Sequence, residues 1–511
     1  MLPVIDLFAG PGGLGEGFTE AGFDIRLSIE CNETAHKTLL FRSFYRKIKD
    51  KHISDIKDFL SKKIDIQELY LKHQEEYEEA SQEAWQATLG ETPDKEVADR
   101  IHSALGTAKK WILIGGPPCQ AYSLAARSRA KNEGEKFEND VRHFLYKQYL
   151  HIVAEHAPDI FVMENVRGIL SANVKKNKIF TQILKDLESP RSATAVKPRR
   201  HIKDLSYQLY PLVIPEETNF DGTYSQEDYL VKAEEHGVPQ CRHRVFIIGI
   251  RKGSGIKMQH LEKNPSDMTT VEDVIDDLPP LRSDYTKATK LDWVSSLQSI
   301  KKESWFKAMK KNDPLLYGVM EEELESLLPT AYNGAMILKK PSKSKQPKKL
   351  RAWYNRQNLE FILNHECRNH MSEDLKRYFY AACYSLAHNV SPTLSKYPAS
   401  LLPKHENIKS ADGKIIFDDR FRVQCWEKPS TTVVSHISKD GHYYIHPNPA
   451  QCRSFSVREA ARIQTFPDDY FFQGPRTAQF HQVGNAVPPY LAWQIARNIA
   501  NMLGKKPHGD Y

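Results

Sequence analysis

The 511-residue sequence contains few cysteines, seven in all, and no two of them form a C-x-x-C pair. A small, odd and scattered set of cysteines argues against a disulfide framework and a zinc ribbon, so we predict no metal site. Long apolar runs are also missing, because no stretch approaches the length of a membrane span. The first residues lack the basic region of a secretory signal, and a cytoplasmic protein is therefore expected.

A large excess of either charge is missing too, since 72 lysines and arginines face 65 aspartates and glutamates, a net charge of +7. The distribution of charge says more than the total. One run without acids holds Lys339, Lys340, Lys343, Lys345, Lys348, Lys349 and Arg351. A second run holds Lys197, Arg199, Arg200 and Lys203. Such runs favour a polyanionic partner, and a solvated loop is an equally good interpretation of each run alone.

Short apolar segments alternate with helical patterns over the first half of the chain. The strand candidates are Val4–Phe8, Phe23–Ile29, Trp111–Ile114, Ile160–Met163 and Val245–Ile250. A helix is expected from about Leu14, between the first two strands. This β-α-β succession predicts an α/β fold with a parallel sheet.

A helical insertion interrupts this pattern at about residues 60–106. Apolar residues fall near one face of a first helix, which Gly90 ends. Thr92-Pro93 offers an N-cap and a first-turn proline for a second helix that ends near Gly106. We interpret the helical pair as structural, with a nucleic-acid or partner contact as the alternative.

The periodicity weakens over residues 256–450, where aromatic residues, lysines, prolines and polar loops dominate. We interpret this span as a separate, smaller and irregular domain. The tail is helix-like again from Tyr490 to Leu503. The sequence thus predicts a sheet-bearing domain over residues 1–255, the second domain over residues 256–450, and a return to the first over residues 451–511.

A glycine-rich turn joins the first strand to the helix that follows. Gly10, Gly12 and Gly15 match the pattern G-x-G-x-x-G, which lets the backbone turn tightly under a ligand. Glu30 stands at the end of the next strand, where it can accept hydrogen bonds from ribose hydroxyls. The pattern predicts a cofactor that carries adenosine, and it does not separate a dinucleotide from another such cofactor.

A rigid turn follows the strand Trp111–Ile114 and reads Gly115-Gly116-Pro117-Pro118-Cys119-Gln120. Two glycines and two prolines fix its backbone at the carboxyl edge of the sheet, where α/β proteins form their sites. Cys119 is therefore presented rather than packed, which suits a nucleophile in its thiolate form. A buried structural cysteine is the alternative, and such a residue needs no rigid turn.

Two further strands bring charged residues toward the same edge. Glu164 ends the strand that begins at Ile160, and a desolvated carboxyl there can hold a proton and donate it to a ring nitrogen. Arg242 and Arg244 enter the strand Val245–Ile250, and their spacing turns both side chains the same way, along a phosphate or base edge. A helix-capping acid and ordinary strand-flanking charges are the alternatives for each motif alone.

Six segments in this order resemble the C5-cytosine DNA methyltransferase family: DLFAGPGG, GGPPCQ, ENV, QCRHR, then REAARIQ at residues 458–464 and GNAVPP at residues 484–489. They span nearly the whole chain. The resemblance implies a Rossmann-like sheet that binds S-adenosyl-L-methionine. It also implies a variable target-recognition domain between the fourth and fifth segments, where this chain becomes irregular and basic. The insertion at residues 60–106 departs from the family pattern.

The resemblance implies a set of cofactor contacts. Asp55-Ile56 resembles the family's contact to the adenine, and Asn485 and Val487 return from the C-terminal part to close the pocket. The implied cofactor-binding residues are Phe8, Ala9, Gly10, Gly12, Gly13, Leu14, Glu30, Asp55, Ile56, Pro117, Asn485 and Val487.

For the reaction, the resemblance implies that Cys119 attacks C6 of cytosine while Glu164 contacts N3 and the exocyclic amine. Arg244 resembles the arginine that reaches O2, and Arg242 steadies the catalytic loop. The implied substrate contacts are Pro118, Gln120, Ser123 and Asn165. The base has to be flipped out of the duplex, and the polar segment after Cys119, with Tyr122, Arg127, Arg129 and Lys131, is expected to close over it.

The implied partners are double-stranded DNA and a restriction endonuclease or phage-defence system that acts on the same site. A monomer located at the nucleoid is expected. Three alternatives are an RNA cytosine methyltransferase, a DNA-binding relative without activity, and a nicotinamide oxidoreductase. The first shares the motifs and stays open. The intact Cys119, Glu164, Arg242 and Arg244 argue against the second, and the GGPPCQ and ENV segments argue against the third.

Overall fold

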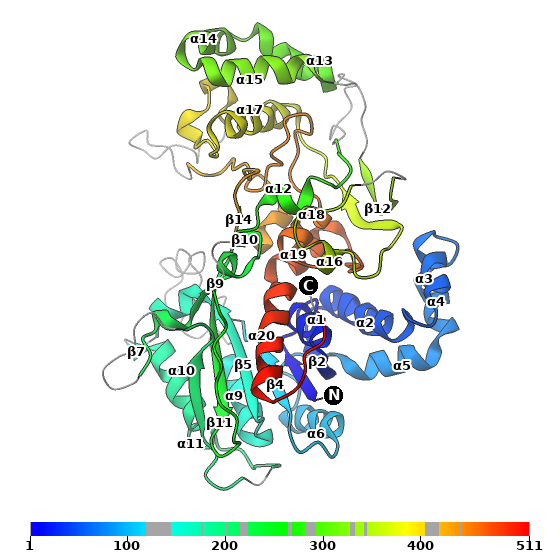
Figure 1. The fold of residues 1–511 in the computed structure, drawn as a ribbon, viewed down its shortest axis with the longest axis vertical. Helices are drawn as coiled ribbons and strands as arrows, with labels where there is room; N and C mark the ends of the chain where they lie inside the picture. The colour runs from blue at the N-terminus through cyan, green and yellow to red at the C-terminus, as the bar shows by residue number, and fades with distance from the viewer. Residues whose placement is uncertain are drawn as a thin grey trace.

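The computed structural model has an eight-stranded sheet in one half of the molecule and a group of helices in the other (Figure 1). It describes residues 2–118, 145–174, 177–200, 202–214, 223–263, 268–282, 293–327, 333–341, 345–403, 418–439 and 441–509. The first strand and the last helix both belong to the half with the sheet, so the two ends of the chain meet there.

The strands of the main sheet follow the order β3-β2-β1-β4-β5-β11-β8, and β9 pairs with β11 outside this path. Their bounds are β1 Pro3–Leu7, β2 Asp24–Glu30, β3 Ala84–Gln86, β4 Ile112–Gly115, β5 Ile160–Val166, β8 Tyr207–Pro211, β9 Leu230–Lys232 and β11 His243–Arg251. The strands from β3 to β5 are parallel, whereas β11 runs antiparallel to its neighbours. The predicted α/β fold is confirmed, and the parallel strands end at one carboxyl edge.

Helices cover both faces of this sheet because alternate strand residues point to opposite sides. In β1, Val4 belongs to a core shared with α1 and α20, while Ile5 and Leu7 belong to a core shared with α6, α9 and α10. These helices are α1 Gly13–Glu20, α6 Asp94–Leu105, α9 Leu145–His156, α10 Ile179–Glu188 and α20 Pro489–Met502. The helices expected from Leu14 and from Tyr490 are thus confirmed.

The helical insertion is more divided than the sequence predicts, with a break at His73. The helices around it are α2 Glu33–Ile48, α3 Ile53–Leu60, α4 Ile66–Lys72 and α5 Gln74–Glu83. Ala84–Gln86 then adds β3 to the main sheet, a strand too short for its periodicity to be recognised. The second predicted helix, α6, ends at Gly106 as expected. Pro93 rather than Thr92 occupies its N-cap position, because the backbone of Pro93 stays extended with ψ of 130°.

Residues 256–450 are more helical than the irregular domain that the sequence predicts. Several helices enclose a core of their own, which includes Trp293, Phe306, Tyr378 and Tyr397. These helices are α13 Trp293–Gln298, α14 Ser304–Asn312, α15 Pro314–Glu325 and α17 Ser372–His388. These four aromatic residues are thus core residues. The periodicity looks weak at the start of this group because α13 and α14 have only six and nine residues.

Other parts of the same span pack against the main sheet. Val271, Trp353, Ile362 and Val433 share the core that covers one face of β1 and β4. The elements beside them are α12 Val271–Ile275, β12 Gly334–Lys339, α16 Arg351–Tyr354, β13 Phe361–Glu366 and α18 Val457–Ile463. The separate aromatic core therefore occupies a narrower part of the chain than residues 256–450.

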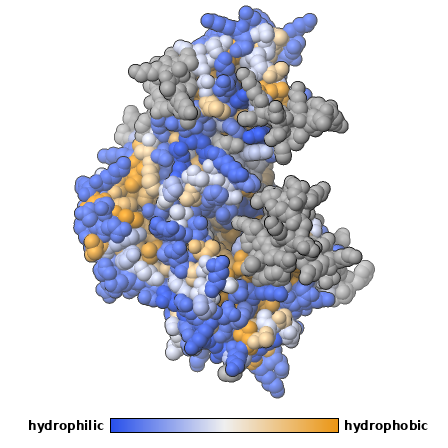
Figure 2. Space-filling view, turned by 180° about the vertical axis from the view of Figure 1, so that it is seen from behind, coloured by the Kyte–Doolittle hydropathy of each residue, from blue (hydrophilic) through white to orange (hydrophobic). Residues whose placement is uncertain are grey.

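Hydrophilic residues dominate the face shown in Figure 2, with smaller apolar areas between them. The longest described helix, α17, has 17 residues and carries charged side chains such as Lys376 and Arg377. In the part of the chain that the structure describes, no helix is long and apolar enough to cross a membrane.

Candidate active site

A glycine-rich turn lies at the carboxyl end of β1. Three of its residues have a positive φ: Phe8 at 57°, Gly10 at 57° and Gly12 at 95°. Glycine adopts this conformation freely, whereas a residue with a side chain does so rarely. No atom of the described residues lies within 4 Å of the Cβ that Gly10 lacks. The turn therefore borders open space.

Glu30 ties this turn to the end of β2. Its Oε2 accepts a 2.8 Å hydrogen bond from the Gly10 N–H, and its Oε1 accepts a 2.7 Å hydrogen bond from the Asn32 N–H. The carboxylate thus supports the turn itself, a role that the sequence pattern did not reveal. A carboxylate offers about four acceptor positions, so capacity remains for ribose hydroxyls. The turn, the space at Gly10 and Glu30 together fit a cofactor that carries adenosine.

The C-terminal segment returns to the glycine turn. The Cβ that Gly13 lacks would lie 2.3 Å from the Val487 carbonyl oxygen, so glycine at this position serves the packing of α1 on that segment. Val487 is buried in the contact, and Asn485 is exposed at the end of α19 (Arg476–Asn485). Leu14 lies in the core with α20, and Ala9 is nearly buried.

Asp55 and Ile56 are not brought to this turn. Ile56 lies in a separate core with residues of α2, α4 and α5, and Asp55 bonds to Lys72 and His73. On the side of β2 away from β1, the neighbouring strand is β3. Ala87, the first residue after β3, therefore lies beside the end of β2, at the position that was predicted for Asp55. Its N–H donates a 3.1 Å hydrogen bond to the Glu30 carbonyl oxygen. The sequence placed Asp55 there because a three-residue strand leaves no recognisable pattern.

The turn after β4 is closely packed between β1 and β5. The Cβ that Gly115 lacks would lie 2.6 Å from the Leu7 carbonyl oxygen. The Cβ that Gly116 lacks would lie 2.7 Å from Oε2 of Glu164. A larger residue at either position would displace its neighbour, so both glycines are needed to bring the turn and the Glu164 carboxyl together.

Asn165 holds the next part of this turn. Its side-chain amide donates a 3.3 Å hydrogen bond to the Pro117 carbonyl oxygen, and its own side-chain oxygen accepts a 2.8 Å hydrogen bond from the Val166 N–H. Pro117 is buried, and Pro118 is half-buried at the last described position before the predicted nucleophile. The predicted site residues that follow, Cys119, Gln120 and Ser123, lie outside the described residues, as does the basic segment after them.

Glu164 and Arg244 meet across β5 and β11. The register pairs Glu164 with Phe246 and Arg244 with Val166, which turns both charged side chains to the same face. Arg244 Nε lies 3.1 Å from Glu164 Oε1, with the two side chains 15% and 13% exposed. Burial raises the pKa of the Glu164 carboxyl, because the attraction of its arginine neighbours only partly offsets the loss of water. The carboxyl therefore keeps its proton to a higher pH than an ordinary glutamate does.

Arg242 does not join Arg244 along a base or phosphate edge, which corrects that part of the prediction. Its side chain is 2% exposed and donates hydrogen bonds of 2.9 Å to the Val433 carbonyl oxygen and 3.2 Å to the Gly484 carbonyl oxygen. Arg242 lies between β10 (Gln240–Cys241) and β11, outside an extended strand, so the expected i, i+2 alignment does not hold. It ties the start of β11 to two distant segments.

Sequence reasoning assigned no role to the arginines in and before α18. Arg453 pairs with Glu459 at 2.6 Å, and Arg462 pairs with Asp468 at 2.8 Å. Arg458 donates to backbone carbonyl oxygens, among them one of β13 at 2.7 Å. All three arginines are buried, and they connect α18 and the residues before it to residues of the span 256–450. The available signal was their presence in a segment that is otherwise largely apolar.

Residues of both basic runs form contacts with other parts of the protein. Lys348 forms an ion pair with a neighbouring glutamate, and Lys349 Nζ donates a 2.8 Å hydrogen bond to a backbone carbonyl oxygen. Arg199 and Arg200 form ion pairs with aspartates at 2.6 Å and 3.2 Å. Each run therefore forms contacts within the protein, and Lys343 lies outside the described residues.

Comparison with known proteins places these features in one family. The family model for C-5 cytosine-specific DNA methylases matches residues 2–69, 71–190 and 211–501. The type II methyltransferase M.Bpa9945I of Bacillus paralicheniformis is 31% identical, over 98% of this chain and 99% of its own length. The type II methyltransferase M.DdeI of Desulfomicrobium norvegicum is 26% identical, over 97% of this chain and 88% of its own.

A solved structure gives the same fold. A prophage-encoded protein of E. coli, described as a candidate DNA modification methyltransferase, matches 99% of this chain and 100% of its own with a TM-score of 0.53 and 19% identity. At that identity the likeness shows the fold alone, and it agrees with the mostly parallel sheet. The family match covers most of the chain and shows more. The chain belongs to the C-5 cytosine-specific DNA methylase family and is a DNA (cytosine-5-)-methyltransferase with S-adenosylmethionine as its methyl donor.

Proposed function

We propose that this methyltransferase acts on cytosine at the carboxyl edge of the main sheet, with Cys119 as the nucleophile and Glu164 as the acid. One observation carries the proposal: Glu164 Oε2 stands against Gly116, in the turn that leads through two prolines to Cys119. A carboxyl with a raised pKa and a cysteine after a rigid turn are the two groups that addition to a pyrimidine ring needs.

The chemistry follows from cytosine, whose C5 is a poor nucleophile. The Cys119 thiolate forms an S–C6 bond while N3 takes the proton of Glu164, which leaves an enamine with electron density at C5. When bound, S-adenosylmethionine would supply the electrophilic methyl group that C5 accepts, and the electron pair of its S–CH3 bond would stay on the neutral thioether S-adenosylhomocysteine. A base then removes the C5 proton, the C5–C6 double bond returns, and Cys119 leaves as a thiolate. Glu164 recovers its proton from N3.

On the cofactor side, we expect the glycine turn, Glu30 and Val487 to hold S-adenosylmethionine. The open space beside Gly10 and the remaining acceptor capacity of Glu30 support this assignment. The segment that begins at Ala87, directly after β3, is proposed in place of Asp55-Ile56 on the adenine side, because it leaves the strand next to β2.

The proposed substrate is a cytosine flipped out of double-stranded DNA, at a cost of a few kcal/mol. We assign target recognition to residues 256–450 and catalysis to residues 1–255 and 451–511. The separate aromatic core, which begins at Trp293, supports a distinct unit for the later part of the first span. The type II relatives support a companion restriction endonuclease or defence system. A cytoplasmic monomer at the nucleoid is proposed.

Bisulfite sequencing of DNA from cells that express the chain tests this proposal. Methylated cytosines should share one sequence context and should disappear in Cys119→Ser. Exchange of residues 256–450 for the matching span of M.DdeI should move methylation to the context of that enzyme. Methylation that persists in Cys119→Ser, that falls on RNA instead of DNA, or that keeps its context in an active chimera would contradict the corresponding assignment.

A further inference from the structure

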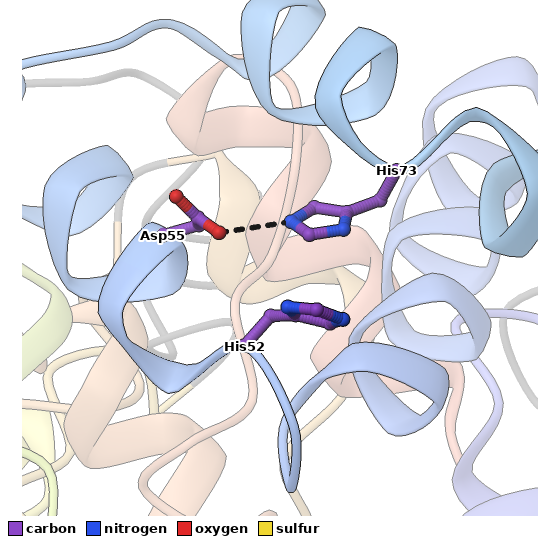
Figure 3. Close-up of side chains that lie close together, drawn as sticks. All are labelled: His52, Asp55 and His73. Carbon is purple, nitrogen blue, oxygen red and sulfur yellow. Dashed lines mark hydrogen bonds and ion pairs between the residues drawn. The ribbon is translucent and has the colours of Figure 1, made fainter.

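The segment from His52 to His73, which no step of the proposed methyl transfer uses, brings together two imidazoles and a carboxylate (Figure 3). His52 precedes α3, Asp55 lies in the first turn of α3, and His73 stands between α4 and α5. Their potential ligand atoms all lie within 4.8 Å of one another. This group could not be recognised from the sequence, because α4 and most of α3 separate His73 from the other two residues along the chain.

The distances suit a shared cation. His73 Nε2 lies 3.1 Å from Asp55 Oδ2, and the ring centroids of His52 and His73 are 4.3 Å apart. In a tetrahedral zinc site with bonds of about 2.0–2.1 Å, ligand atoms lie roughly 3.3 Å from one another. The pair of His73 and Asp55 already has nearly that separation, whereas the His52 side chain would have to rotate to bring a ring nitrogen equally close.

The surroundings hold the three groups in place. The His52 N–H donates a 2.8 Å hydrogen bond to the last turn of α2, and the His73 N–H donates a 3.2 Å bond to α4. The Phe44 ring packs beside the mostly buried His73 ring, 6.4 Å between centroids. Lys72 Nζ lies 3.2 Å from Asp55 Oδ1, which keeps the other carboxylate oxygen directed at His73.

We propose that His52, Asp55 and His73 bind a divalent transition-metal ion, with Zn²⁺ as the best match, and that the ion clamps α3 to the junction of α4 and α5. Imidazole nitrogens with one carboxylate suit Zn²⁺, whereas Mg²⁺ and Ca²⁺ prefer sites made of oxygen ligands. Three protein ligands leave a fourth position for water. Because the site exists only in the folded chain, the ion would stabilise the insertion that adds β3 to the sheet.

Titration of Zn²⁺ into the full, chelator-treated chain tests the proposal. The variants are His52→Gln and Asp55→Asn, and the matched control is His102→Ala, an exposed histidine of α6. The two variants should bind Zn²⁺ at least about ten-fold more weakly than the wild type and the control, since loss even of a group that only orients a ligand costs about 10- to 100-fold. Equal affinity in all four proteins would overturn the site.

Two further measurements use the wild-type protein. At a Zn²⁺ concentration about 100 times Kd, the unfolding temperature should rise by a few degrees, and Mg²⁺ at the same concentration should leave it unchanged. Co²⁺ should produce the visible absorption bands of a four-coordinate site with nitrogen and oxygen ligands. An equal response to Mg²⁺, or the absence of Co²⁺ bands, would overturn the proposal.

Discussion

The carboxyl groups of two buried Glu–Arg pairs in this protein have pKa values shifted in opposite directions. Glu164 meets Arg244 at the catalytic edge through a 3.1 Å contact between Oε1 and Nε. Glu459 meets Arg453 beside α18 through two parallel contacts of 2.6 Å and 2.7 Å. It also accepts a 2.7 Å hydrogen bond from the Ser456 N–H, as the acid of a capping box.

The pKa values follow the donors that each carboxyl receives. Burial raises the pKa of Glu164, and the nearby arginines offset this only in part. Burial acts in the same direction on Glu459, but the charge and hydrogen bonds of Arg453, together with two histidines, hold the pKa of Glu459 well below its usual range. A buried carboxyl group thus stays ionised where hydrogen-bond donors surround it, as at Glu459. Where it has fewer donors, as at Glu164, it keeps its proton more readily.

Glu164→Gln removes the acid of the catalytic Glu–Arg pair and should have the largest effect of the proposed variants. The amide cannot give a proton to N3, so the single-turnover rate of methyl transfer should fall by about 10²- to 10⁴-fold. Binding of S-adenosylmethionine, measured by calorimetry, should be retained because Glu30 and the glycine turn are untouched. An unchanged single-turnover rate would show that Glu164 has only a structural role.

Glu459→Gln should affect stability instead of rate. Arg453 would remain buried without its counter-charge, so urea unfolding should show a loss of about 3–5 kcal/mol in the free energy of unfolding. The single-turnover rate per folded molecule should change little. A large loss of rate without a loss of stability would mean that the two pairs do not differ as their donors indicate.

The pH dependence of the rate sharpens the comparison. A raised pKa at Glu164 means that its proton persists as the pH rises and is lost only above that pKa, so the single-turnover rate should fall along an alkaline limb. In Arg244→Met the loss of a nearby positive charge should move this limb to higher pH. The plateau should also be about 10- to 100-fold lower, because a charged hydrogen bond is lost.

Two variants control this measurement. Arg244→Lys keeps the positive charge and should leave the limb nearly in place. In Glu164→Gln the limb should vanish, because the titrating group is gone. If the alkaline limb survives in Glu164→Gln, it belongs to another group, and the assignment of Glu164 as the acid would be wrong.

The exposed pair of Lys348 and Glu272 should give the smallest effect. Lys348→Gln should cost less than about 1 kcal/mol of unfolding free energy, as is usual for a surface ion pair. It should change the log–log salt slope of DNA binding by clearly less than the roughly 0.9 expected for a lost phosphate contact. The matched control is Lys345→Gln, which removes the same charge from an exposed lysine of the same run. A full change of about 0.9 in Lys348→Gln would assign this lysine to the DNA backbone.

The catalytic edge could be predicted from the sequence because short turns of unusual composition carry its chemistry. The glycines at positions 10 and 12 and the segment that leads to Pro117 are recognisable without the fold. Glu164 also follows an apolar segment directly and lies two residues before the end of β5, close to the carboxyl edge of the sheet. Local composition is enough for such features, since neighbouring residues in the chain determine them.

Contacts between distant segments could not be predicted in the same way. Gly13 belongs to a recognisable ligand turn, yet its missing side chain makes room for Val487. Arg242 follows the motif pattern, yet the start of β11 directs it into the interior. Asp55 was assigned to the adenine contact by the family resemblance, yet β3 takes the neighbouring place in the sheet. In each case the partner lies far along the chain, and only the packing decides the role.

Formation of a covalent bond between Cys119 and DNA tests the central claim most directly. If the target cytosine carries fluorine at C5, the last step cannot release that substituent as a cation, so the S–C6 bond should persist. With S-adenosylmethionine and such a duplex, the wild type should form a complex that survives denaturation, and mass spectrometry should locate the nucleotide on Cys119. Cys119→Ser should form no such complex. A stable adduct on another residue, or near-normal methylation of ordinary DNA by Cys119→Ser, would contradict the mechanism.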